Sequence, residues 1–160
     1  MTTGRTKTEI KILSWNVNGL GDKIKRGTVL QYTLRHHADI VLLQETHMLG
    51  NACKALDRRG YKMASHSGYT TNSRGVGILI RKALPLVIQQ QWVDASGRYA
   101  ALTGKWEGKS LNIISIYIPP RLQENAFSET STRLMQMREG ILVLGGDFNL
   151  TLDRNKDRWP

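Results

Sequence analysis

The chain of 160 residues has little cysteine, no long apolar run and few acidic residues. Cys53 is its only cysteine, which excludes an internal disulfide and favours a reducing, intracellular setting. The longest apolar runs, such as residues 40–43 and 141–144, are four residues long and far too short to span a bilayer. The N-terminus MTTGRTKTE also lacks the apolar core of a signal peptide. We therefore expect a folded intracellular protein with no membrane partner.

Acidic residues are outnumbered, since 13 Asp and Glu stand against 23 Lys and Arg and give a net charge of +10 at pH 7. A balance of this kind favours a polyanionic partner, for which nucleic acid is the commonest explanation, although it also suits a membrane surface or solubility alone. The basic residues are scattered along the chain, so folding has to bring them to one face.

Hydrophobic patterning divides the chain into a polar tail, residues 1–8, and a single domain, residues 9–160. Residues 9–15 alternate as a strand does, residues 23–36 have helical spacing, and residues 40–43 form a short buried strand. A strand, helix and strand in this order predict a crossover unit of two parallel strands.

The rest of the domain is predicted to be mostly strands with two helices. We expect strands over residues 61–66, 75–81, 86–93, 99–106, 111–118 and 141–144, and helices over residues 51–59 and 121–138. A tight turn at Gly108-Lys109 joins two of the strands in a hairpin. The chain is therefore of the mixed α/β (α+β) class, with helices flanking sheets and functional residues at strand ends.

Carboxylate and amide residues stand where the expected strands end. Asn16 follows the first strand, and Glu45 follows the apolar run 40–43. Sheet proteins gather metal and phosphate ligands at such ends. A carboxylate is a hard ligand suited to Mg²⁺ or Mn²⁺ rather than zinc, so Glu45 is a candidate metal ligand, with a surface capping glutamate as the alternative.

Asp147 and Asn149 follow the last strand after two glycines that allow close backbone approach. Phe148 should point the opposite way, so the carboxylate and the amide share one side. Such a pair suits water activation in phosphodiester hydrolysis, and an Asx turn is the simpler alternative. Tyr117 lies at another strand end, as a phosphate donor or as a core tyrosine. The four histidines are interpreted as structural.

Four motifs in order, WNVNGL, LQETH, YIPP and GGDFN, resemble the endonuclease/exonuclease/phosphatase superfamily, which includes deoxyribonuclease I, exonuclease III and the apurinic endonucleases. The resemblance spans residues 10–149 and implies a four-layer αββα sandwich and metal-dependent phosphodiester hydrolysis. It implies that Asn16 helps to hold the phosphate or metal, Glu45 binds Mg²⁺ or Mn²⁺ and Tyr117 contacts the phosphate. Asp147 would position or deprotonate water, and Asn149 would orient it.

The details are most similar to the endonuclease domains of non-LTR (LINE-type) retrotransposons, which nick DNA for insertion. Asn18 and His47 stand where apurinic enzymes usually show Asp and Lys, and LDRNKDRW is a weaker retrotransposon-like segment. The resemblance thus implies double-stranded DNA as partner, nuclear action and a basic contact surface, for which the candidates are Arg74, Arg121 and Arg154.

Histidine is absent after Gly145, whereas family members end in a Ser-Asp-His or similar element and carry a further Asp before it. We therefore expect a truncated domain without its last strands, whose open sheet edge favours self-association.

Several functions stay open beside the nicking endonuclease. They are a DNA-binding remnant without catalysis, an apurinic repair endonuclease and a phosphatase of the same superfamily.

Overall fold

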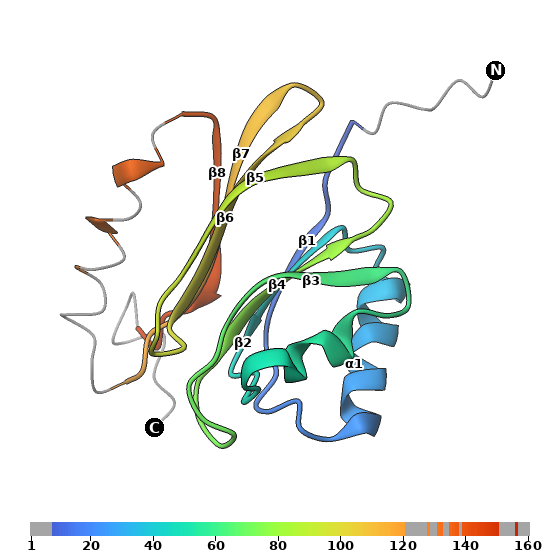
Figure 1. Ribbon diagram of the computed structural model, residues 1–160, viewed down its shortest axis with the longest axis vertical. Helices are drawn as coiled ribbons and strands as arrows, with labels where there is room; N and C mark the ends of the chain where they lie inside the picture. The colour runs from blue at the N-terminus through green and yellow to red at the C-terminus, as the bar shows by residue number, and fades with distance from the viewer. Residues whose placement is uncertain are drawn as a thin grey trace.

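Two sheets packed face to face form the body of the protein, with helix α1 on the outer face of the first sheet (Figure 1). The structure is a computed structural model that describes residues 8–120, 128, 131–132, 135–137, 139–150 and 156. The mixed α and β class predicted from the sequence is confirmed. No helix in the described part of the chain is long and apolar enough to cross a membrane.

The first sheet has the strand order β1-β2-β4-β3, and its strands are β1 (Ile12–Asn16), β2 (Ile40–Gln44), β3 (Tyr61–Ser67) and β4 (Val76–Arg81). Helix α1 (Lys23–Arg35) joins the parallel strands β1 and β2, as the crossover prediction requires. It begins at Asp22, whose carboxylate caps the helix by accepting the N–H of Lys25. The register places Asn16 opposite Gln44, so Glu45 emerges next to Asn16.

The second sheet has the strand order β5-β6-β7-β8, and its strands are β5 (Leu86–Val93), β6 (Tyr99–Trp106), β7 (Lys109–Tyr117) and β8 (Ile141–Asp147). Strands β7 and β8 are parallel, and their register places Tyr117 opposite Asp147. The β6–β7 hairpin turns at Glu107 and Gly108, with φ of 49° and 76°, one residue earlier than expected. Positive φ at both positions matches the right-handed twist of the flanking strands.

Helices depart most from the sequence prediction. The segment expected as a helix over residues 51–59 is the 3₁₀-helix η1 (Gly50–Leu56), which contains Cys53. A segment this short gains little from α-helical hydrogen bonding, which favours the tighter 3₁₀ form. Most of the helix expected over residues 121–138 lies outside the described residues. Met137 from this segment packs on the outer face of the second sheet against Ala101 and Ile114.

Strand β2 is buried on both faces, which explains its uninterrupted apolar sequence. Ile40 and Leu42 face the second sheet and join the cluster between the two sheets. Val41 and Leu43 face α1 and join the cluster beneath the helix. The next residue in this alternation, Gln44, therefore points between the sheets.

Gln44 is a polar connection between the two sheets, with 1% of its surface exposed. Its Nε2 donates to Ser14 Oγ in the first sheet at 3.3 Å and to Ser115 Oγ in the second at 3.2 Å. The Ser115 hydroxyl in turn donates to the carbonyl of Leu43 at 3.1 Å. Because these groups are buried, losing one partner would leave the others unsatisfied, and the set fixes how the sheets align.

Two glycines let β8 lie close to its neighbours. A Cβ on Gly146 would overlap the carbonyl oxygen of Ile116, and one on Gly145 would lie 2.5 Å from Leu42 Cδ1. We expect Gly146→Ala to lower the free energy of unfolding by about 1–3 kcal/mol, because strand β8 has to move to relieve the overlap.

The effect of Gly146→Ala is measured by thermal or urea unfolding. Gly21→Ala is the matched control, because no atom lies within 4 Å of a Cβ built there. Equal stability of the two variants would contradict the close approach of β8 and β7.

Candidate active site

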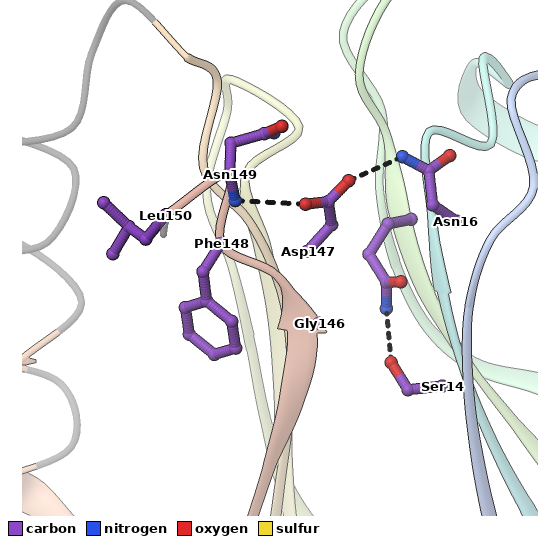
Figure 2. Close-up of a pocket in the computed structure, with 8 residues that line it drawn as sticks. Ser14, Asn16, Gly146, Asp147, Phe148, Asn149 and Leu150 are labelled. Atoms are coloured by element: carbon purple, nitrogen blue, oxygen red, sulfur yellow. Dashed lines mark hydrogen bonds between the residues drawn. The ribbon is translucent and has the colours of Figure 1, made fainter. Parts of the chain in front are cut away.

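The ends of β1, β2, β7 and β8 meet at one end of the molecule, because each sheet contributes a parallel pair of strands that finishes there. A cavity of about 700 Å³ opens between these ends (Figure 2). Its lining comes from both sheets and consists of Ser14, Asn16, Gln44, Gly146, Asp147, Phe148, Asn149 and Leu150. Asn16, Asp147 and Asn149, three of the predicted site residues, therefore share one location.

The side-chain amide of Asn16 connects two carboxylates from different sheets. Its Nδ2 donates to Glu45 Oε1 at 2.9 Å and to Asp147 Oδ2 at 2.8 Å. Its Oδ1 accepts the backbone N–H of Asn18 at 3.0 Å, which orients the NH₂ group toward the carboxylates. Hydrogen bonds to ionised groups are stronger than neutral ones, so Asn16 holds the two acids close despite their repulsion. We call Asn16, Glu45, Tyr117 and Asp147 the acidic cluster.

Glu45 owes its direction to a left-handed backbone, with φ of 52°. A non-glycine residue adopts this conformation uncommonly, and its surroundings usually hold it there. The enforcement comes from both sides, because the N–H of Gly19 donates to the Glu45 carbonyl at 2.7 Å and the N–H of Thr46 donates to the Gly75 carbonyl at 3.0 Å. The chain thus leaves β2 abruptly and turns the Glu45 carboxylate toward Asn16.

Tyr117 ends β7 with 9% of its surface exposed and hydrogen bonds with Glu45. Burial raises the pKa of Tyr117 to about 12, and the hydrogen bond with Glu45 and the charges of Glu45 and Asp147 act in the same direction. The positive charge of Arg74 opposes them. At neutral pH the phenol therefore keeps its proton and is a hydrogen-bond donor.

Asp147 accepts hydrogen bonds at both oxygens, since the N–H of Asn149 donates to Oδ1 at 3.1 Å while Oδ2 faces Asn16 (Figure 2). This is the Asx turn that the sequence left open as the simpler alternative, and it coexists with the contact to Asn16. The Asn149 side chain donates to the carbonyl of Ile118 at 2.8 Å. Phe148 packs separately with Tyr99, Ile116 and Ile118. The turn therefore directs Asp147 into the site and Phe148 into the core.

The three arginines predicted to bind nucleic acid fall in different parts of the chain. Arg74 lies next to the acidic cluster, because its carbonyl accepts the N–H of His47 at 3.0 Å and its charge acts on Tyr117. Arg121 and Arg154 lie outside the described residues.

His47 was interpreted from the sequence as structural, and the structure places its Nε2 3.4 Å from Glu45 Oε2. Only its position two residues after Glu45 could have indicated this. His66 lies behind the same turn, with its Nε2 2.9 Å from the Thr46 hydroxyl. Burial lowers the pKa of His66 to about 4, so its ring is neutral at pH 7. One ring nitrogen then donates a hydrogen bond and the other accepts one.

The donor atoms of the acidic cluster suit a magnesium ion. Glu45 and Asp147 offer carboxylate oxygens. Among the described residues, no three His, Cys, Asp or Glu side chains lie close enough together to hold a metal ion by themselves. Mg²⁺ is commonly held by one or two carboxylates and keeps several waters, so this small all-oxygen set fits it. Zinc sites in proteins are built mainly from histidine nitrogen and cysteine sulfur, which the two carboxylates do not supply.

Comparisons with known proteins identify similar sequences and folds. A family model described as the Endonuclease/Exonuclease/phosphatase family matches residues 13–160. The Transposon TX1 uncharacterized 149 kDa protein of Xenopus laevis is 28% identical over 156 residues, which cover 94% of this chain and 12% of that protein.

Solved structures share the fold. The endonuclease domain of TRAS1, a telomere-specific non-LTR retrotransposon, has a TM-score of 0.67 at 16% identity, over 89% of this chain and 62% of that one. The AP endonuclease LMAP from Leishmania major has a TM-score of 0.70 at 17% identity, over 94% of this chain and 58% of that one. The chain thus spans less than two thirds of each of these proteins.

Proposed function

The chain belongs to the Endonuclease/Exonuclease/phosphatase family, and from this membership we propose that it hydrolyses phosphodiester bonds in DNA with the help of a magnesium ion. The observation that carries the proposal is the Asn16 amide that holds Glu45 and Asp147 together at the mouth of a cavity. Two neighbouring carboxylates repel each other, which costs stability, and a bound cation would neutralise them. Their arrangement therefore suits cation binding better than a purely structural role.

Each member of the acidic cluster has a role in the proposed reaction. Glu45, with Asn16 beside it, would hold a Mg²⁺ or Mn²⁺ ion that neutralises charge on the phosphate. Asp147 takes a proton from the attacking water, and the Asx turn keeps its carboxylate in place. The protonated phenol of Tyr117 donates a hydrogen bond to a phosphate oxygen where negative charge develops.

DNA is the substrate that the composition favours. The net charge of +10 suits a long polyanion better than a small phosphate. The relatives named as a transposon protein and a retrotransposon endonuclease support DNA as the substrate class. We propose that the cut is a nick in one strand of double-stranded DNA. Such a reaction on chromosomal DNA would take place in the nucleus.

Nicking of supercoiled plasmid by the 160-residue chain tests the proposal. We expect relaxation with Mg²⁺ or Mn²⁺ and none with EDTA. Glu45→Gln and Asp147→Asn should each lower the rate by about 10³-fold, because each removes a charge needed in the transition state. Glu107→Gln is the control, since this acid is exposed on the β6–β7 turn at the opposite end of the sheet.

The other functions left open by the sequence give different results in the same experiment. A DNA-binding remnant would bind plasmid in a salt-sensitive way without nicking it in any metal. A repair endonuclease would cut only plasmid containing abasic sites. A phosphatase would release inorganic phosphate from small esters and leave plasmid intact. Each of these outcomes would overturn the nicking proposal.

A further inference from the structure

The loop between β3 and β4, residues 68–75, carries an exposed aromatic ring beside the acidic cluster. Tyr69 has 45% of its surface exposed, and the guanidinium carbon of Arg74 lies 4.3 Å from the centre of its ring. The loop projects from the same end of the sheets as Glu45, because Val76 at the start of β4 pairs with Gln44 at the end of β2 (Figure 1). This end of the sheets therefore carries an exposed tyrosine stacked on an arginine.

The Tyr69–Arg74 stack is held in place by the β5–β6 loop of the other sheet. Arg74 Nη1 donates to the carbonyl of Ser96 at 3.2 Å, and the N–H of Gly75 donates to the carbonyl of Gly97 at 3.1 Å. Gly97, with φ of 66°, permits the contact, since a Cβ there would lie 2.9 Å from Tyr69 Cβ. The stack is therefore ordered before any ligand arrives, which lowers the entropy lost on binding.

The same loop is joined directly to the backbone that follows Glu45. The N–H of His47 donates to the carbonyl of Arg74, and the N–H of Thr46 donates to the carbonyl of Gly75, both at 3.0 Å. A phosphate bound at Arg74 would therefore lie close to one bound at the acidic cluster. The charge of Arg74 also acts on Tyr117, so one nucleic acid strand could contact both places.

We propose that Tyr69 and Arg74 form a nucleotide-binding platform, on which an unpaired base next to the cleaved phosphate stacks on Tyr69 while its phosphate binds Arg74. Arg74 covers one face of the ring, so the base takes the other face. Stacking on an aromatic ring accepts any base, whereas a fully paired base is already stacked in the duplex. The platform rests on the proposed function and narrows its substrate to DNA with a locally unpaired nucleotide.

Binding of the full chain to labelled DNA in EDTA, followed by fluorescence anisotropy, tests the platform without cleavage. The probes are a fully paired duplex, the same duplex with one unpaired nucleotide, and a third with an abasic residue at that position. We expect about 10-fold tighter binding to the unpaired nucleotide than to the other two probes, the size typical of one stacked base.

Tyr69→Ala should remove this preference, and Tyr69→Phe should retain it because the ring remains. Tyr32→Ala is the matched control, since Tyr32 has 43% of its surface exposed and lies on α1 against Trp15 and His36. Arg74→Gln should weaken binding to all three probes. It should also reduce the slope of log affinity against log salt concentration by about one. Circular dichroism melting verifies that each variant is folded.

Several outcomes would overturn the platform. They include a folded Tyr69→Ala protein that keeps the preference, a Tyr69→Phe protein that loses it, and a wild-type chain that shows none. Plasmid nicking is measured separately, so these outcomes leave the proposed hydrolysis standing. Failure to nick, with the preference intact, would overturn the hydrolysis and leave the platform. A wild-type chain that binds no DNA would overturn both.

Discussion

Asn16→Asp is expected to abolish magnesium-dependent nicking and to lower the free energy of unfolding in EDTA by about 3 kcal/mol at pH 7. The substitution keeps the size of the side chain and removes the two donors that Glu45 Oε1 and Asp147 Oδ2 accept from. It also places a third negative charge between the two acids. The loss of two charge-assisted hydrogen bonds and the added repulsion both lower the free energy of unfolding.

Magnesium should reverse much of the destabilisation in Asn16→Asp, because a cation among three carboxylates relieves their repulsion. We therefore expect Mg²⁺ to raise the melting temperature of this variant more than that of the wild type. Asn18→Asp is the matched control, since it adds the same charge two residues away, where the side chain is exposed. If Asn16→Asp were as stable as Asn18→Asp in EDTA, the amide would not be holding the acids together.

Acid should destabilise the protein through His66. Burial holds its pKa at about 4, against an ordinary value of 6.5 in the unfolded chain. Between these two pH values, His66 is protonated in the unfolded chain and neutral in the folded protein. Stability is fully present above pH 6.5 and is lost as the pH falls toward 4, by a total of about 3 kcal/mol.

Urea unfolding at a series of pH values measures the His66 effect. His66→Gln should flatten the decline between pH 6.5 and 4, because glutamine can meet the Thr46 hydroxyl without titrating. His37→Gln should leave the decline unchanged, since His37 is exposed after α1. A wild-type protein equally stable at pH 4.5 and 7 would show that His66 protonates without penalty.

Sequence patterns sufficed for the strands because their signals are local. Residues 86–93 and 99–106 were predicted with the bounds of β5 and β6, since β-branched and aromatic runs between turns need no distant information. The crossover rule then placed Glu45 beside Asn16. Their positions at expected strand ends selected Tyr117 and Asp147, and the structure brings both to the same place.

The remaining features depend on contacts between distant residues, which a single sequence does not display. Gln44 continues an apolar run as a polar residue, and only the packed sheets reveal Ser14 and Ser115 as its partners. Tyr69 and Arg74 form their stack because Gly97, far along the chain, leaves room for it. The 3₁₀ form of η1 follows instead from the shortness of the segment, since few α-helical hydrogen bonds can form in it.

The two sheets divide the chain in order, since the first uses residues up to Arg81 and the second begins at Leu86. A ribosome therefore finishes the whole first sheet, with Asn16 at the end of β1 and Glu45 just after β2, before it makes the strand that carries Asp147. Until β8 pairs with β7, the residues already made hold only one of the two carboxylates of the cluster. The site proposed to hold a cation and cleave DNA would thus be completed only when β8 is in place, after the first sheet exists.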